Sequence, residues 1–414
     1  MSSAPPNGSG PAGSGPARAV RRVPARPMGA RSVDVVVPLF LPCAAGVEGL
    51  LADECAAILG LDASVVPADP TARPIVTLRG GVQVRGDAGV AMRLNLECRL
   101  AQRVLWPLAQ GRYQSEADLY ALARTVPWPD WITPQQTFRI DTTARQSPLR
   151  SLNFATLRVK DALCDALREA SGGERPSVDT RAPDLPLSLH LAPDEATLYA
   201  DTSGEALFKR GWRDAQGGRL DVKGEAPLKE TLAAAMLAAA GWQGRAEDGP
   251  LLDPCCGAGT IAIEAAQMAC GLAPGLHRRF AFERQAPFRR HAAAWQAMRQ
   301  AALARAHDPV VPVFAGDVSF RMTDFAARNA ERAGVRGAIE FKTADALQRP
   351  APAPRGTLMM NPPYGERIAA KGTGSGGGGA RQAPSREHFE GDGTPAEFFA
   401  GLAAHWKRHY AGWN

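Results

Sequence analysis

The residues with the clearest chemical potential are Asn361-Pro362-Pro363-Tyr364, directly after the apolar run T357-L-M-M360. Proline fixes φ and has no N–H, so the pair predicts a stiff, extended backbone whose carbonyls are free to accept. The Asn361 side chain and the Pro362 carbonyl could hold both hydrogens of a nucleobase amine and turn its lone pair toward a sulfonium methyl. Tyr364 offers a ring for the base to stack on. An ordinary turn is the alternative, but we predict methyl transfer to an amino nitrogen.

A second motif, L251-L-D-P-C-C-G-A-G-T260, is typical of a strand, a tight loop and the start of a helix. Gly257 and Gly259 would let the backbone approach a ligand closely. The nucleotide P-loop is not indicated because no Lys follows the glycines, and the dinucleotide fingerprint is not indicated because position 262 is alanine. A cofactor without a pyrophosphate, S-adenosylmethionine (SAM), fits better.

Three acids, Asp253, Asp317 and Asp345, each follow a predicted strand. At the carboxyl ends of parallel strands they would face a ligand together. They could accept hydrogen bonds from the methionine ammonium, the ribose hydroxyls and the adenine amine of SAM, respectively. The alternative is that each Asp caps a helix. The predicted cofactor-binding residues are Asp253, Pro254, Gly257, Gly259, Asp317 and Asp345.

The elements that must position these residues alternate along the second half of the chain. Predicted strands at 251–253, 310–314, 338–341 and 357–360 are interleaved with predicted helices at 226–241, 260–269 and 322–333. This alternation predicts a parallel, doubly wound sheet. Upstream, an α+β pattern begins near residue 33, with a helix over 46–60, strands at 75–78 and 82–84 and a helix over 88–100.

Composition narrows the function classes. The chain has 414 residues, and segments 1–32, 33–230 and 231–414 carry net charges of +5, −4 and +5. The basic total is therefore weak evidence for nucleic acid, and RNA contacts would come from local patches. Seven cysteines without C-x-x-C spacing predict neither disulfides nor a metal site, and favour reducing cytosol. No apolar run is long enough to cross a bilayer, so no membrane partner is predicted. Residues 371–385 form a Gly-rich loop.

Several motifs together resemble the THUMP-domain ribosomal RNA guanine-N2 methyltransferases of bacteria, which act on 23S rRNA. The resemblance extends over residues 35–414. The matching motifs are G46-V-E-G-L-L-A-D-E54, G81-V-Q-V-R-G-D87, L152-N-F-A-T-L-R-V-K-D-A-L-C-D-A166, R175-P-S-V-D179 with P183-D-L-P-L-S-L-H-L191, D201-T-S-G-E-A-L-F-K-R-G-W-R213, A226-P-L-K-E-T-L-A-A-A235, D253-P-C-C-G-A-G-T260, A273-P-G-L-H-R278 and N361-P-P-Y-G-E-R367.

The resemblance implies SAM-dependent methylation of a guanine N2 in RNA, by an α+β N-terminal region and a Rossmann-like class I methyltransferase domain. The implied division is a basic tail at 1–32, a ferredoxin-like region at 33–87, a THUMP RNA-binding domain at 88–200, a linker at 201–225 and the methyltransferase domain at 226–414. If the roles of the matching family residues are transferred to this chain, the six cofactor residues line SAM, and Asn361 to Tyr364 hold the base.

The sequence also departs from this family. The motif at Asp317 reads D-V-S, and the chain ends at A411-G-W-N414, where the family continues into further strands. About four strands precede that point, which predicts an incomplete sheet with one bare strand edge. Three alternatives stay open: a tRNA guanine-N2 enzyme, a DNA adenine-N6 enzyme, and a truncated, non-catalytic RNA-binding protein.

A few further residues have two interpretations. The pairs Lys209-Arg210, Arg278-Arg279 and Arg289-Arg290 either contact phosphates or are solvated. Trp128 and Trp131 are predicted to pack rather than stack on bases. Glu264 either hydrogen-bonds the glycine loop or faces a gap.

Overall fold

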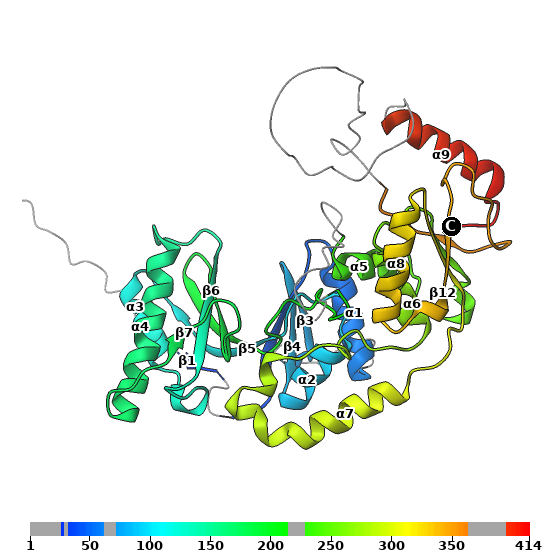
Figure 1. The fold of residues 1–414 in the computed structure, drawn as a ribbon. Helices are drawn as coiled ribbons and strands as arrows, with labels where there is room; N and C mark the ends of the chain where they lie inside the picture. The colour runs from blue at the N-terminus through cyan, green and yellow to red at the C-terminus, as the bar shows by residue number, and fades with distance from the viewer. Residues whose placement is uncertain (1–25, 29–31, 62–71, 214–227, 363–394) are drawn as a thin grey trace, which may run out of the picture.

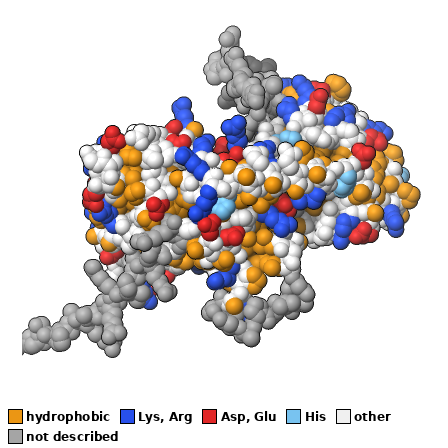
Figure 2. All heavy atoms as spheres, turned by 90° about the horizontal axis from the view of Figure 1, so that it is seen from below, with side chains coloured by type: hydrophobic (Ala, Val, Ile, Leu, Met, Phe, Trp, Pro, Cys, Tyr) orange, Lys and Arg blue, Asp and Glu red, His pale blue; other side chains and the backbone are white. Residues whose placement is uncertain are grey.

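A computed structural model describes residues 26–28, 32–61, 72–213, 228–362 and 395–414. Within these ranges the chain builds two sheets, one in the N-terminal half and one in the C-terminal half (Figure 1). No helix in this part of the chain is both long and apolar enough to pass through a bilayer. On the face in Figure 2, basic side chains are interspersed with acidic and apolar ones.

The first unit of the N-terminal half follows the predicted pattern closely. Its elements are β2 (Val37–Pro42), α1 (Glu48–Leu59), β3 (Ile75–Leu78), β4 (Gly81–Gly86) and α2 (Ala88–Glu97). Gly60 ends α1 in the left-handed conformation, at φ 66°, which explains why a glycine follows the last apolar position. Strand β2 begins four residues later than the apolar run at Val33 predicts.

The second unit contains β5 (Leu105–Arg112), α3 (Glu116–Arg124), β6 (Thr137–Ala144), α4 (Leu152–Ser171), β7 (Ser177–Val178), β8 (Leu185–Leu191) and β9 (Glu195–Asp201). Helices α3 and α4 pack against each other and α4 packs on β6. Trp128 and Trp131 are almost completely buried, which confirms that they are packing residues.

Both N-terminal units share one sheet, with the order β3-β4-β2-β5-β9-β8-β6-β7. Strand β5 joins the units because it pairs with β2 on one side and β9 on the other. Helix α2 contacts α1 and β4, so it packs with the first unit, whereas the sequence division placed it with the second. Within the segment expected to be a tail, β1 (Arg26–Pro27) pairs with β5.

The C-terminal half is the predicted parallel sheet. Its strands are β10 (Leu251–Asp253), β11 (Val313–Asp317), β12 (Ile339–Thr343) and β13 (Thr357–Leu358), in the order β12-β11-β10-β13. Its helices are α5 (Glu230–Ala239), α6 (Thr260–Ala269), α7 (Ala292–Ala304), α8 (Phe320–Arg332) and α9 (Pro395–His409). Short 3-10 turns in this half lie at Ala246–Asp248, Ala281–Glu283, Ala286–His291 and Arg336–Ala338, and one in the N-terminal half lies at Trp128–Asp130.

The two faces of this sheet bury different cores. Leu251, Val313 and Ala315 pack with apolar residues of α6 and α8, whereas Leu252 and Phe314 pack with Tyr410 at the end of α9. This alternation follows from the period of two along each strand. The described part of the sheet has four strands, as counted from the sequence.

The edge of β13 is occupied, whereas the sequence predicts a bare strand edge. The Leu358 N–H donates to the Asn414 carbonyl and the Asn414 N–H donates to the Gly356 carbonyl, both at 2.9 Å. Gly356 and Trp413 form a parallel bridge. The last two residues of the chain therefore satisfy backbone groups that would otherwise be exposed.

Candidate cofactor and substrate site

The carboxyl ends of β10, β11 and β13 form a common rim. Asp253 is the last residue of β10, and Asp317 is the last residue of β11. The Met359 N–H donates to the Leu252 carbonyl at 2.9 Å, so the backbone beyond β13 runs beside the end of β10. Asn361 follows two residues later and is half-buried. The glycine motif and the Asn-Pro motif, about 100 residues apart in sequence, are therefore brought to one edge of the sheet.

The glycine loop is fixed to β11 and α8. The Cys256 N–H donates to the Gly316 carbonyl at 2.7 Å, and the Gly257 N–H donates to Asp317 Oδ2 at 3.0 Å. Gly259 has φ 86°, and a Cβ there would lie 3.0 Å from the Ala326 Cβ. Both its conformation and its close approach to α8 therefore favour glycine.

The charges of the three predicted acids all act on one group, the Cys255 thiol. Burial, followed by the charges of Asp253, Asp317 and Asp345, raises the pKa of that thiol. Strand ends β11 and β12 are also joined directly, because the Ala344 N–H donates to the Asp317 carbonyl at 3.0 Å. Cys255 was not among the predicted site residues.

Each acid also holds its own backbone turn. Asp317 Oδ1 accepts from the Ser319 N–H at 2.9 Å, just before α8, and Asp345 Oδ1 accepts from the Leu347 N–H at 2.8 Å. Asp253 Oδ1 accepts from the Cys255 N–H at 3.3 Å. None of the three caps a helix, because Gly259 and Ser319 are the N-cap residues of α6 and α8 and no helix begins at Asp345. These short contacts instead close local turns and orient the carboxylates at the rim.

Asp253 is the most deeply buried of the three, at 1% exposure. Burial, with a smaller contribution from the Asp317 charge, raises its pKa to about 8, although the Cys255 N–H and the Arg349 charge partly oppose this. Burial likewise raises the pKa of Asp317. A cationic ligand at this rim would relieve the cost of holding these carboxylates ionised. This set of carboxylate acceptors suits the ammonium, hydroxyl and amine groups of SAM.

Three of the sequence interpretations are wrong. Glu264 is completely buried and pairs with Arg99 and Arg210, each at 3.0 Å, rather than with the glycine loop or a gap. Arg210 and Arg278 are buried, so neither is solvated nor available to a phosphate. Arg278 instead donates to backbone carbonyls, including those of Ala206 and Ser203. The local sequence carried no signal for these long-range partners.

Some predicted features lie outside the described residues, namely Pro363, Tyr364, the Gly-rich loop and Pro227 at the start of the 226–241 helix. Pro254 follows Asp253 at the first turn of the glycine loop. Within the described ranges no cluster of His, Cys, Asp and Glu side chains could hold a metal ion.

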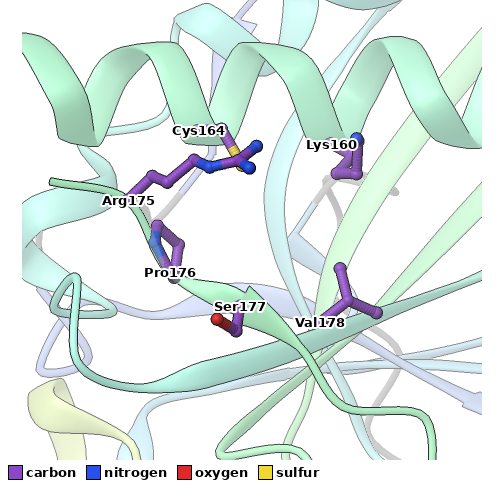
Figure 3. A pocket seen from close by; sticks show the side chains of 6 residues that line it. All are labelled: Lys160, Cys164, Arg175, Pro176, Ser177 and Val178. Atoms are coloured by element: carbon purple, nitrogen blue, oxygen red, sulfur yellow. The ribbon is translucent and has the colours of Figure 1, made fainter. Parts of the chain in front are cut away.

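A cleft of about 270 Å³ lies between α4 and β7, far from this rim in sequence (Figure 3). Its lining residues are Lys160, Cys164, Arg175, Pro176, Ser177 and Val178. The charges of Lys160, Arg175 and Arg168 all act on the Cys164 thiol, where they oppose the larger effect of burial, which raises its pKa. Strand β7 is the last strand of its sheet, and Val178 is 53% exposed.

Comparison with protein-family models divides the chain in three. An RlmL ferredoxin-like domain matches residues 38–105, a THUMP domain matches residues 113–201 and an RMKL-like methyltransferase domain matches residues 216–375. The first two matches are separated by residues 106–112, which belong to β5, the strand that joins the two N-terminal units.

Curated relatives include ribosomal RNA large subunit methyltransferase K/L of Shewanella sp. (strain W3-18-1), 40% identical over 294 residues, and that of Shewanella baltica (strain OS195), 41% identical. Each match covers 70% of this chain and 40% of the relative, so the chain spans less than half the length of these relatives.

Solved structures of similar proteins cover most of the chain. A possible methylase from Clostridium difficile 630 is 30% identical with a TM-score of 0.66, over 80% of this chain and 81% of its own. A protein from Listeria monocytogenes, described as a predicted N6-adenine-specific DNA methylase, is 28% identical with a TM-score of 0.71, over 91% of this chain and 87% of its own. SMU.472, described as a putative methyltransferase and solved with SAH, is 26% identical with a TM-score of 0.68. This match covers 81% of this chain and 83% of SMU.472.

Proposed function

The chain belongs to the family of methyltransferases that combine an RlmL ferredoxin-like domain, a THUMP domain and an RMKL-like catalytic domain, and from this premise we propose that it methylates the exocyclic N2 amine of a guanine in large-subunit (23S) ribosomal RNA. The methyl donor is SAM. The observation that carries the proposal is the shared rim, where Asn361 follows β13 beside the Asp253 end of β10.

In this proposal each motif has one task. Asp253, Asp317 and Asp345 bind the cationic and hydroxyl groups of the cofactor, which supplies a methyl group on sulfonium. The Asn361 side chain and the Pro362 carbonyl accept the two N–H groups of the guanine amine and aim its lone pair at that methyl. Bound SAM would supply the methyl group, and its carbon–sulfur bond would break as the guanine nitrogen bonds to the methyl carbon. The resulting ammonium is acidic enough to lose its proton to water, so no strong base is required.

Two observations favour RNA over the adenine of DNA. A THUMP domain matches residues 113–201, and the curated relatives carry a ribosomal RNA name. The Listeria relative, in contrast, carries the DNA adenine description. A tRNA guanine and a purely RNA-binding role are the remaining alternatives. Reducing cytosol stays a prediction from the cysteine content.

The direct test is methylation of protein-free 23S rRNA, transfer RNA and duplex DNA with labelled SAM, followed by nucleoside mass spectrometry. We expect label in N2-methylguanosine from 23S rRNA. Label in N6-methyladenosine, or only in transfer RNA, would replace the proposed substrate. Calorimetry with SAM and no RNA separates the enzyme from an RNA-binding protein, since only the enzyme binds SAM.

Replacing Asp317 with alanine is expected to weaken SAM binding roughly ten- to hundredfold, because the ribose would lose a charged acceptor and Gly257 would lose its anchor. Isothermal calorimetry measures this dissociation constant. The control is Asp324→Ala on α8, which removes a partly exposed acid that pairs with Arg328 and should leave SAM affinity unchanged. An unaltered dissociation constant in Asp317→Ala would refute the ribose assignment.

The cleft between α4 and β7 is proposed as one RNA contact of the THUMP domain. Lys160 and Arg175 line it and no acid does, which favours a phosphate. The double variant Lys160→Ala, Arg175→Ala should lower the affinity for 23S rRNA and flatten the slope of log K against log salt by about one to two. Fluorescence anisotropy over a salt series measures both.

The control for this cleft is Arg245→Ala with Arg305→Ala, which removes two cations outside the THUMP domain whose side chains are about half exposed. This double variant should keep the wild-type slope. If both double variants lower the slope equally, the attraction is diffuse and the cleft is not a specific contact.

A further inference from the structure

A buried group of charged side chains joins the N-terminal half to the catalytic half. Glu264 of α6 is completely buried and pairs with Arg99, which follows α2, and with Arg210, which follows β9. Burial alone would raise the Glu264 pKa, but the two guanidinium groups outweigh burial and hold it below its ordinary value. In the triad of Arg99, Arg210 and Glu264 one ionised carboxylate is therefore shared by two guanidinium groups.

Both arginines are further held by backbone. Arg99 donates to the Leu272 carbonyl, and Arg210 donates to the carbonyls of Leu207 and Arg99. The Arg99 N–H in turn donates to Glu54 of α1 at 2.7 Å. Helix α1 also contacts α5 of the catalytic half. The triad thus reaches from the first unit of the N-terminal half to the interior of the catalytic half.

A second arm reaches the glycine loop itself. Arg213 pairs with Glu230 of α5 at 2.7 Å and donates to the Thr260 hydroxyl at 2.5 Å. Thr260 is the first residue of α6 and directly follows Gly259, and Glu264 lies one turn further along. The first two turns of the helix that begins at the cofactor loop are therefore tied to arginines outside the catalytic core.

An ion triad of this kind is a poor source of stability, because desolvating the charges offsets their attraction, but it tolerates only one geometry. Methyl transfer between two large bound partners is sensitive to geometry, and a misplacement of about 1 Å can cost roughly a hundredfold in rate. The N-terminal half would bind the RNA, and the rim beside α6 would bind SAM.

We propose that the triad of Arg99, Arg210 and Glu264 positions the glycine loop relative to the RNA-binding half, so that these are positioning residues for methyl transfer. This inference rests on the proposed function. Its expected signature is a loss of kcat with little change in the binding of either partner.

The main variant is Arg99→Met in the full chain, because Glu264 then keeps Arg210 as its partner and the fold is preserved. We expect kcat on 23S rRNA to fall at least tenfold, while the dissociation constants for SAM and RNA stay within threefold. The matched control is Arg103→Met, which breaks a pair with the buried Asp201 entirely inside the N-terminal half. This control should lower Tm without lowering kcat.

A structural role is separated from a positioning role by the triple variant Arg99→Met, Arg210→Met, Glu264→Leu. Apolar replacement of a whole buried ion group restores stability in other proteins, so Tm should recover. A positioning role requires kcat to stay low. Recovery of kcat together with Tm, or a loss of SAM affinity as large as the loss of kcat, overturns the proposal.

A distance measurement tests directly whether the triad fixes the junction between the two halves, even if the wild-type chain methylates no RNA. Spin labels at Arg93→Cys on α2 and Arg328→Cys on α8 span the junction, and both side chains are over 40% exposed. Six native cysteines are buried and the seventh is half-buried, so the new thiols label first. The distance distribution should broaden in Arg99→Met and stay narrow in Arg103→Met. Equal widths in all three proteins would contradict the proposal.

Discussion

Methyl transfer should fall at least a hundredfold when Asn361 is replaced by alanine, while SAM and RNA still bind. The side-chain oxygen is expected to act mainly in the transition state, where it holds one amine hydrogen as nitrogen becomes tetrahedral. Removing a single such preorganised contact costs roughly 10²–10³ in kcat in other enzymes. Single-turnover methylation with labelled SAM measures the rate, and calorimetry measures the two affinities.

The informative control at this position is Asn361→Asp. A carboxylate keeps an acceptor in the same place, so this variant should retain more activity than Asn361→Ala. Turnover unchanged in Asn361→Ala would remove the proposed role of this residue. Equal and complete loss in both variants, with SAM affinity also lost, would indicate that Asn361 supports the rim rather than the base.

SAM affinity should rise with pH up to about 8, roughly tenfold per unit over the lower part of that range. Burial raises the pKa of Asp253 to about 8, so at pH 6 the carboxyl is mostly protonated and accepts weakly from an ammonium. SAM binds the ionised form, and binding is therefore coupled to proton release. Calorimetry between pH 5.5 and 7.5 measures the slope before α-amino groups titrate.

The variant Asp253→Asn should bind SAM weakly and with a flat pH profile over the same range. A slope that survives in Asp253→Asn would assign the titration to another group, such as Asp317, whose pKa burial also raises.

The raised pKa of Asp253 also predicts that the stability of the SAM-free protein falls as pH rises, whereas SAM affinity increases. A carboxyl whose folded pKa is raised contributes stability that is complete below its unfolded pKa, near 4, and is lost as pH rises through about 8. Free Asp253→Asn should therefore be more stable than the wild type at pH 9, by on the order of 5 kcal/mol. Thermal unfolding without SAM tests this sign.

The sequence alone was sufficient for the four strands and for α5, α6 and α8 of the catalytic half, whereas α7 and α9 were not predicted. Apolar runs bounded by glycine and proline marked β10, α6 and β13, because strand and helix periods are local properties. Gly257, Gly259 and Asn361 could be chosen by residue type, because left-handed φ, close approach and amide acceptors each restrict the residue that can serve. The THUMP and methyltransferase motifs then gave the family.

Tertiary structure alone decided which residues meet. Glu264 pairs with Arg99, 165 positions earlier, and nothing in the local pattern around either residue predicts that partner. The division between the N-terminal units lies beyond α2 because β5 pairs with strands of both, which is a non-local property. The edge of β13 is covered by residues 413–414 for the same reason. Periodicity and residue type act over a few positions, whereas burial of charge and pairing of strand edges depend on groups that only the folded chain brings together.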